Sequence, residues 1–167
     1  MIHTLLEEAP GFCLLIDIGG GTVDLVGFVD GMPDGKYAIS DKATLYCINK
    51  VNDEMVARLG ASVPPYFVES FMRNGDYDCP DKYRTEITRC LREYSSDIYD
   101  VIRANHYNLD LTNMVFMGGG ASIIKHFGNN KNKKVQFVTD VCANAKGCEA
   151  AVKSIMRANQ MRKEARA

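Results

Sequence analysis

The sequence predicts an α/β fold in which helices pack on a mixed β-sheet. Two short apolar runs have the pattern of strands buried on both faces of a sheet, and one long stretch carries its apolar residues at helical spacing. In the second half of the chain, predicted strands and helices alternate. With 167 residues, 46% of them hydrophobic and 25% charged, the composition is that of one globular domain, not of a disordered, collagen-like or coiled-coil protein.

The first part of the chain is predicted to form strands that double back on one another. The run at 12–17 is apolar up to its final aspartate, and a glycine-rich turn separates it from a second apolar stretch. The Asp-Gly pairs at 30–31 and 34–35 frame a further turn. Strands are therefore expected at residues 12–17, 23–29 and 36–40. Residues 44–48 are compatible with a further strand.

The middle of the chain is predicted to be helical. A helix from 49 to 59 is closed by Gly60, and two prolines then start a short helix that ends near residue 75. Residues 49–82 are expected to form a small helical insert subdomain. The clearest helix spans 83–105, where the apolar positions step by four and three residues. These positions are Ile87, Leu91, Tyr94, Ile98 and Val101.

The last part of the chain alternates strands and helices. A second buried strand at 113–117 runs into three glycines, and a helix from 121 to 127 follows. A short strand is expected at 135–138 and a closing helix from 143 to 161. The whole chain, 1–167, is accordingly expected to fold as a single domain.

Charge is distributed unevenly along the chain. Residues 1–120 carry 10 basic and 18 acidic side chains, a net charge of −8, whereas residues 121–167 carry 10 basic and 3 acidic side chains, a net charge of +7. A basic end suits nucleic acid or an acidic partner, although it is more often a solvated helix and loop. No aromatic residues are interleaved with these charges, so a stacking platform for single-stranded nucleic acid is not indicated.

The sequence has no pattern typical of a membrane-spanning segment or of a secreted protein. No apolar run approaches the length of a membrane span, and the first residues lack the pattern of a signal peptide. The six cysteines are scattered, without a C-x-x-C pair or a histidine at ligand spacing. We therefore expect free thiols, no metal site built from cysteine or histidine, no membrane partner and a cytoplasmic location.

The first candidate motif is Asp17-Ile-Gly-Gly-Gly-Thr-Val-Asp24, at the end of the first buried strand. Consecutive glycines let backbone N–H groups converge on phosphate oxygens, because no Cβ stands in the way. A strand follows the glycines, which excludes the dinucleotide fingerprint and the P-loop, since both need a helix there. The motif predicts a tight phosphate-binding hairpin with Asp17 placed to hold hydrated Mg²⁺ or to orient an attacking water. A hairpin that needs glycine for geometry alone is the alternative.

The second candidate motif is Met117-Gly-Gly-Gly-Ala-Ser-Ile-Ile-Lys125, which a helix follows. The N-terminus of that helix can face an anion, or the sugar and α-phosphate of a nucleotide. Many strand–glycine–helix turns bind nothing. The two glycine triplets in this order are a more specific signal than either triplet alone.

Together the two motifs resemble those of the superfamily of actin, sugar kinases and heat-shock chaperone ATPases. The first is similar to its second phosphate motif, the second to its adenosine motif, and Asn144-Ala-Lys-Gly-Cys-Glu-Ala-Ala-Val152 to its second connecting helix. The resemblance spans residues 10–160, and within the superfamily the sequence looks most like the bacterial plasmid-segregation actins (the ParM/StbA group). It implies a ribonuclease H-like mixed β-sheet flanked by helices, with a small helical insert, as in the second domain of an actin-like ATPase.

The resemblance also implies ATP and Mg²⁺ in a cleft between two similar halves. Asp17 would act on the Mg²⁺-bound water and the catalytic water. For Asp24, bracing the hairpin is one role among others. The residues implied for the β- and γ-phosphates are Gly19, Gly20, Gly21 and Thr22. Those implied for adenosine are Gly118, Gly119, Gly120 and Ser122, with Asn52, Glu54 and Arg58 of the insert as further candidates.

The family's first phosphate motif and first connecting helix are not in this sequence. We therefore expect the chain to correspond to the C-terminal half of a two-domain ATPase, with the missing N-terminal half as its partner. Alone it should bind ATP weakly and hydrolyse it negligibly, because both walls of the cleft position the phosphates. The full-length protein is expected to form filaments in plasmid segregation or a cytoskeleton, with a DNA-binding adaptor as a further partner. Alternatives are a chaperone-like, ATP-switched binding protein, a sugar or acetate kinase, and a relative that has lost nucleotide binding.

Overall fold

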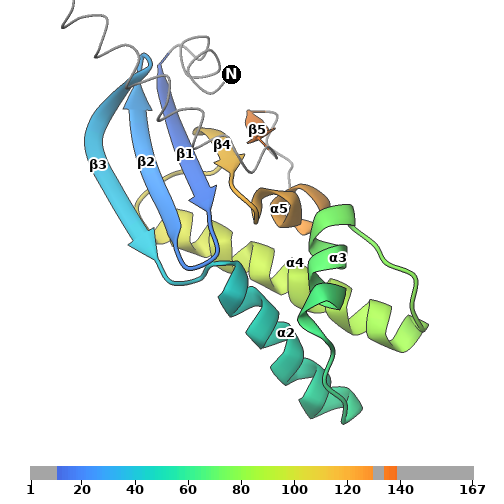
Figure 1. The fold of residues 1–167 in the computed structure, drawn as a ribbon. Helices are drawn as coiled ribbons and strands as arrows, with labels where there is room; N and C mark the ends of the chain where they lie inside the picture. Colours follow the sequence, from blue (N-terminus) through green and yellow to red (C-terminus); the bar gives the residue numbers. More distant parts are fainter. Residues whose placement is uncertain (1–10, 130–133, 139–167) are drawn as a thin grey trace, which may run out of the picture.

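A computed structural model describes residues 11–129 and 134–138 (Figure 1). A β-sheet packs one of its faces against a group of helices, and part of this group extends beyond the ends of the strands. The closing helix expected at 143–161 lies outside the described residues. So does the segment 144–152, which resembles the second connecting helix.

The sheet has five strands in the order β3-β2-β1-β4-β5. The first three form an antiparallel meander, whereas β4 and β5 run parallel to β1. The strands are β1 (Phe12–Ile18), β2 (Val23–Val29), β3 (Met32–Ser40), β4 (Asn113–Met117) and β5 (Val135–Val138). The predicted mixed sheet is thereby confirmed, with β1 at its centre between one antiparallel and one parallel neighbour.

The third strand begins four residues before the predicted one. The chain reverses at Asp30 and Gly31, both of which have positive φ angles (48° and 79°), as a two-residue hairpin turn requires. The second Asp-Gly pair does not turn the chain but lies within β3, next to an irregularity in the β2–β3 register. There Asp34 lies against Gly27, where an added Cβ would come within 2.6 Å of the Asp34 carboxylate. Only one of the two Asp-Gly pairs therefore makes a turn.

Residues 44–48 are not a strand but the first turns of helix α2 (Thr44–Leu59). The buried positions of α2 keep the helical spacing from its start, at Cys47, Ile48, Val51 and Met55. The strand interpretation was wrong because a short apolar run of this length fits either structure until its packing is known. The predicted end of the helix is confirmed, since Gly60 caps α2 with a φ of 68°.

The other three helices lie close to their predicted ranges. They are α3 (Pro65–Asn74), α4 (Asp81–Ala104) and α5 (Ala121–Phe127). Pro65 begins α3, where its fixed φ suits a first helical turn, and Gly75 ends that helix in the left-handed conformation. In Figure 1, α2 and α4 run along each other, with α3 and α5 beside them.

One hydrophobic core joins these helices to one face of the sheet. Leu14 of β1, Met55 of α2, Phe71 of α3 and Ile98 of α4 are fully buried in the same cluster. Side chains alternate across a strand, so Cys13 points to the opposite face. There it forms a second, smaller buried cluster with Val115, Met117 and Val138. The central strands of the sheet are therefore buried on both faces, and the loops at their ends extend from this buried base.

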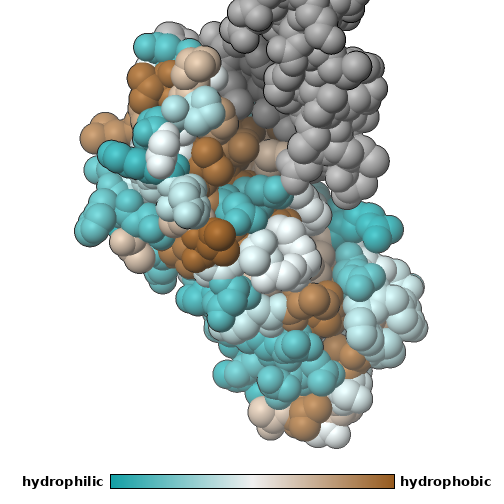
Figure 2. Space-filling model, turned by 60° about the vertical axis from the view of Figure 1, so that its left-hand side comes forward, coloured by the Kyte–Doolittle hydropathy of each residue, from teal (hydrophilic) through white to brown (hydrophobic). Residues whose placement is uncertain are grey.

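The surface of the described residues is mixed. In the view of Figure 2, hydrophobic surface is broken into small patches separated by hydrophilic surface. The most exposed large apolar side chains of the described residues lie on β3 (Met32, Tyr37 and Ile39), on α3 (Tyr66) and at Leu111. No helix in the described ranges is long and apolar enough to cross a bilayer. Within those ranges Cys13, Cys47, Cys79 and Cys90 are free thiols.

Candidate functional site

The fold brings the two glycine turns together. Strands β1 and β4 are parallel neighbours in which Asp17 pairs with Met117, so the turns that follow them lie at the same edge of the sheet. The two turns are hydrogen-bonded, since the Gly120 amide donates to the Ile18 carbonyl at 3.0 Å. In sheets of this kind, ligands bind outside the carboxyl ends of the strands. Residues separated by about a hundred positions in the sequence therefore form one surface.

The second turn is packed tightly against the first strand. Gly118 has a φ of 81°, and a Cβ added there would lie 2.4 Å from an oxygen of Asp17 and 2.6 Å from the Ile18 carbonyl oxygen. A Cβ on Gly120 would lie 2.2 Å from Cγ2 of Ile18. At Gly119, by contrast, nothing lies within 4 Å of an added Cβ. Two of the three glycines are thus required by the fold, and the middle one faces open space.

The first turn has the opposite character. Gly19 closes it by donating its amide to the Thr22 carbonyl at 2.9 Å, whereas Cβ atoms added at Gly20 and Gly21 would meet nothing within 4 Å. No hydrogen bond within the described part of the chain uses the amide of Gly20 or of Gly21. The geometry is a short hairpin bend whose two central amides are accessible to an anion.

Two carboxylates lie beside this bend. Asp17 and Asp24 are directly opposite each other in the antiparallel β1–β2 pair, an arrangement in which like charges repel. The Thr22 hydroxyl donates to the Asp24 carboxylate at 3.0 Å, which suits the bracing role expected for Asp24. A divalent cation relieves such repulsion, and Mg²⁺ prefers one or two carboxylates together with water.

A cavity of about 670 Å³ opens between the two turns and the helices. Its size is within the range of small-molecule sites. It is lined by Gly20, Gly118, Gly119 and Ser122 of the predicted set. The side chain of Ser122 donates to the Gly119 carbonyl at 3.3 Å. The further lining residues are Lys125, which ends the second motif, and seven residues that were not predicted as site residues: Thr44, Leu45, Ile48, Glu69, Met72, Arg73 and His126.

Two reasons explain why those residues were missed. Thr44 and Leu45 fell in the segment that was interpreted as a strand, although they begin α2. Glu69 and Arg73 are four residues apart on α3, so they share one helix face, but nothing in the sequence shows that this face borders a cavity. The four-residue spacing of Glu69 and Arg73 was the available signal. Only the packing of α3 against α5 shows that this helix face borders the cavity.

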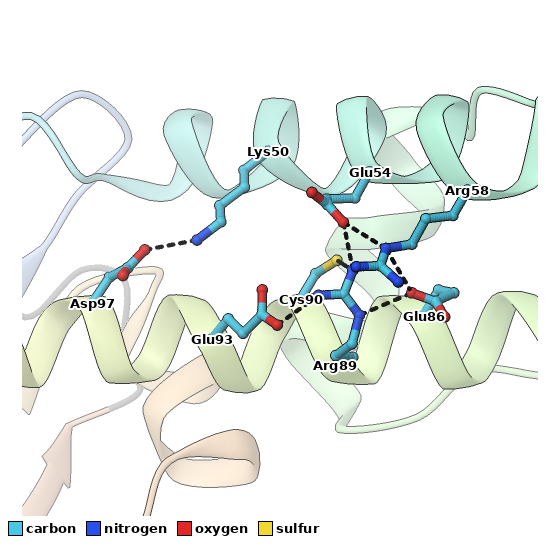
Figure 3. Close-up of polar contacts among 8 residues, drawn as sticks. All are labelled: Lys50, Glu54, Arg58, Glu86, Arg89, Cys90, Glu93 and Asp97. Carbon is cyan, nitrogen blue, oxygen red and sulfur yellow. Dashed lines mark hydrogen bonds and ion pairs between the residues drawn. The ribbon is translucent and has the colours of Figure 1, made fainter.

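Glu54 and Arg58 are not among the residues that line this cavity. They face α4, where the Glu54 carboxylate accepts from Nε of Arg58 at 2.8 Å and from a terminal nitrogen of Arg89 at 2.6 Å (Figure 3). Arg89 also binds Glu86 at 2.9 Å. The third insert candidate, Asn52, accepts a hydrogen bond from the Val63 amide at 3.1 Å. The structure therefore places all three in contacts that hold the helices and loops together.

We expect the ion network that joins Glu54 of α2 to Arg58 and to Arg89 of α4 to make the free energy of unfolding depend on pH in the acid range. Hydrogen bonds from Arg58 and Arg89 hold the pKa of Glu54 below its ordinary value of 4.5. A lowered folded pKa means that the stabilisation is complete above the ordinary value and is lost as pH falls through the folded value. We expect Glu54→Gln to lower the urea midpoint at pH 7, with the difference from wild type shrinking towards pH 3.

Glu69→Gln is the matched control for that experiment. Glu69 is exposed, and none of the ion pairs among the described residues includes it. Its variant should follow the wild-type curve of urea midpoint against pH. If the gap between Glu54→Gln and wild type were constant from pH 7 to pH 3, the network would not be the source of the effect.

The sheet order, the three-strand meander and the parallel β4 and β5 define the ribonuclease H-like fold of actin-like ATPases. The structure is similar to MreB5 of Spiroplasma citri bound to AMPPNP, with a TM-score of 0.71, 17% identity and coverage of 95% of this chain and 59% of that one. It is similar to Ta0583, an archaeal actin homolog (TM-score 0.67, 20% identity, coverage 92% and 52%). It is also similar to Bacillus thuringiensis ParM with ATP (TM-score 0.56, 14% identity, coverage 80% and 42%).

These similarities concern the fold. Comparisons with protein-family models and with curated protein sequences give no match. The chain spans about half the length of the solved structures to which it is similar. The expected ribonuclease H-like, actin-type domain is confirmed.

Proposed function

We propose that this chain is the nucleotide-binding half of an actin-like ATPase. The observation that carries the proposal is the meeting of two glycine turns at a cavity of about 670 Å³, which is lined by Gly20, Gly118 and Gly119. Gly20 and Gly119, and Gly21 beside the cavity, have open space where a Cβ would lie. Open space beside a backbone amide is what a phosphate group needs, because it must approach closer than a Cβ would allow. Similar structures contain ATP, AMPPNP and ADP, which supports a nucleotide as the ligand.

In this proposal the first turn binds the phosphates and the second turn lies at the nucleoside end. The amides of Gly20 and Gly21 donate to the β- and γ-phosphates, with Gly19 and Thr22 shaping the bend. Gly118, Gly119 and Gly120 pass under the adenosine, which Ser122 borders. The charged residues Glu69, Arg73 and Lys125 line the same cavity and supply polar contacts for the sugar and base.

Mg²⁺ fits the carboxylates beside the first turn. Asp17 and Asp24 face each other across β1 and β2, and Asp17 also lies against Gly118, next to the cavity. We assign Asp17 to hold water on the ion and to orient the attacking water. The ion, when bound, would neutralise charge on the phosphates. Thr22 and Asp24 keep the bend in shape from the other strand.

Hydrolysis requires the other half of the fold. Phosphoryl transfer depends on groups positioned around the whole triphosphate, and this chain supplies one wall. We therefore propose that the missing N-terminal half completes the cleft, and that the two-domain protein self-associates into filaments. In the same proposal, these filaments act in plasmid segregation, together with a DNA-binding adaptor, or in a cytoskeleton. This part rests on the sequence resemblance.

Nucleotide binding can be tested by amide NMR on the 167-residue chain. Adding Mg²⁺ and ATP should shift the amide signals of Gly20, Gly21 and Gly119, and turnover should be negligible. Gly21→Ala should leave the urea midpoint unchanged, because its added Cβ meets no protein atom, while weakening ATP binding about tenfold or more. Thr85→Ala, an exposed change on α4 away from the cavity, is the control that should bind ATP like wild type.

Two results would contradict the proposal. If saturating ATP shifted none of the three glycine amides, the chain would not bind nucleotide at this edge of the sheet. Measurable ATP hydrolysis by these 167 residues would show that the missing half is not required for catalysis.

A further inference from the structure

The first glycine turn is hydrogen-bonded to the start of helix α2, whose Thr44 and Leu45 line the same cavity as Gly20. The amide of Thr44 donates to the Gly19 carbonyl at 3.1 Å, and the amide of Leu45 donates to the Gly20 carbonyl at 3.1 Å. The Thr44 hydroxyl adds a second bond to the Gly19 carbonyl at 3.2 Å. No side chain caps α2 at Ala43, so two glycine carbonyls satisfy donors that the first helical turn would leave open.

Peptide planarity turns these bonds into an orientation for the amides. In a trans peptide the C=O and N–H of one unit point in opposite directions, and none of the described peptides is cis. Fixing the Gly19 carbonyl on α2 therefore points the Gly20 N–H away from α2. Fixing the Gly20 carbonyl does the same for the Gly21 N–H. These are the two amides that have open space and no partner within the described residues.

Thr44 also reaches the second turn. A Cβ added to Gly120 would come within 3.0 Å of the Thr44 methyl group, so this side chain lies between both glycine turns. Its hydroxyl contacts one turn and its methyl group the other. The donors of α2 also polarise the peptides they bind, because hydrogen bonds in a chain strengthen one another.

We propose that Thr44 is a positioning residue, which with the first turn of α2 orients the Gly20 and Gly21 amides towards the phosphates of the ligand. This inference rests on the proposed function and names what holds its phosphate site in shape. Thr44 lines the same cavity, but in this proposal it acts through the glycine amides that it orients. It sets the direction of the groups that do.

Thr44→Pro tests this directly, because proline removes both donors of residue 44. Proline is tolerated at the first position of a helix. Ala43 already has the extended conformation that must precede proline, with φ −82° and ψ −174°. Thr44→Val removes only the hydroxyl and keeps the methyl group beside Gly120. Thr44→Ser retains both donors and is the conservative control.

Binding of ATP, tripolyphosphate and adenosine should be measured by amide NMR for each variant. We expect Thr44→Pro, which loses two hydrogen bonds, to weaken the binding of ATP and tripolyphosphate about tenfold. Thr44→Val loses one hydrogen bond and should weaken their binding about threefold. Adenosine binding should stay within about twofold of wild type. Thr44→Ser should match wild type with all three ligands.

The inference and the proposed function fail differently. If wild type binds ATP at the glycine amides and Thr44→Pro and Thr44→Val bind it equally well, Thr44 does not position the turn. The same conclusion follows if these variants lose as much affinity for adenosine as for tripolyphosphate, because a general distortion of the site would then explain the loss. If Thr44→Pro does not fold, Thr44→Val decides the question. If wild type itself shows no response to ATP, the proposed function is wrong.

Discussion

Gly118→Ala should lower the free energy of unfolding by about 3 kcal/mol. Two costs combine at this position. Gly118 has a φ of 81°, a left-handed conformation that a residue with a Cβ adopts only with strain. The added Cβ would also lie 2.6 Å from the Ile18 carbonyl oxygen, which belongs to the backbone of a central strand and cannot move aside cheaply. Urea denaturation at pH 7 measures the change.

The neighbouring glycine supplies the control for that prediction. At Gly119, φ is not positive and an added Cβ would have no neighbour within 4 Å, so Gly119→Ala should change the free energy of unfolding by less than about 0.5 kcal/mol. Under the proposed function it should nonetheless weaken ATP binding, because the Cβ occupies the open space. Equal destabilisation by the two substitutions would show that the turns are not packed as described.

Phe116→Ala should lower the free energy of unfolding by about 4 kcal/mol, because the ring is fully buried and its loss leaves a cavity. Phe116 lies in β4, two residues before Gly118 of the second glycine turn. Its ring packs edge to face with Tyr99 of α4 at a centroid distance of 6.2 Å, and stacks on Phe137 of β5 at 5.7 Å. Domains of this size are stable by about 5–15 kcal/mol, so the loss is large, and it is measured by thermal and urea unfolding.

Phe137→Ala is the matched substitution. Phe137 contacts the same ring from β5, at the edge of the sheet, but is only partly buried, and we expect a loss of about 1–2 kcal/mol. Because the two rings touch, the double variant should be less destabilised than the two single losses added together. Equal effects of the two single substitutions would mean that Phe116 is not the centre of this cluster.

Most strands and helices could be predicted because their sequence signals are local. The apolar run of β1, the four-and-three spacing along α4 and the glycines that end α2 and α3 each specify an element within a few residues. The errors came where two local structures fit the same residues. Thr44 begins a helix because its amide finds the Gly19 carbonyl, and that partner is 25 residues away. The position of β3 likewise depended on which Asp-Gly pair turned the chain.

The sequence predicted that glycine turns follow two buried strands, but it did not show which charged residues border the cavity between them. The glycine triplets and Asp17 carry their chemistry in the sequence, because only consecutive glycines free several amides at once. Glu54 and Arg58 were expected near a nucleotide, but they form ion pairs at the α2–α4 interface. Charged helix residues of this kind serve either purpose, and only the packing of the helix distinguishes the two.

The sequence by itself determined that two glycine turns end two buried strands, and that the first turn carries aspartates beside it. The tertiary structure alone decided that β1 and β4 are neighbours, so that the turns share one edge and one cavity. It also decided that Gly118 and Gly120 are needed for packing, whereas Gly20, Gly21 and Gly119 face open space. The physical reason is distance along the chain: a backbone turn is set by nearby residues, but which atoms surround it is set by strands and helices far away in the sequence.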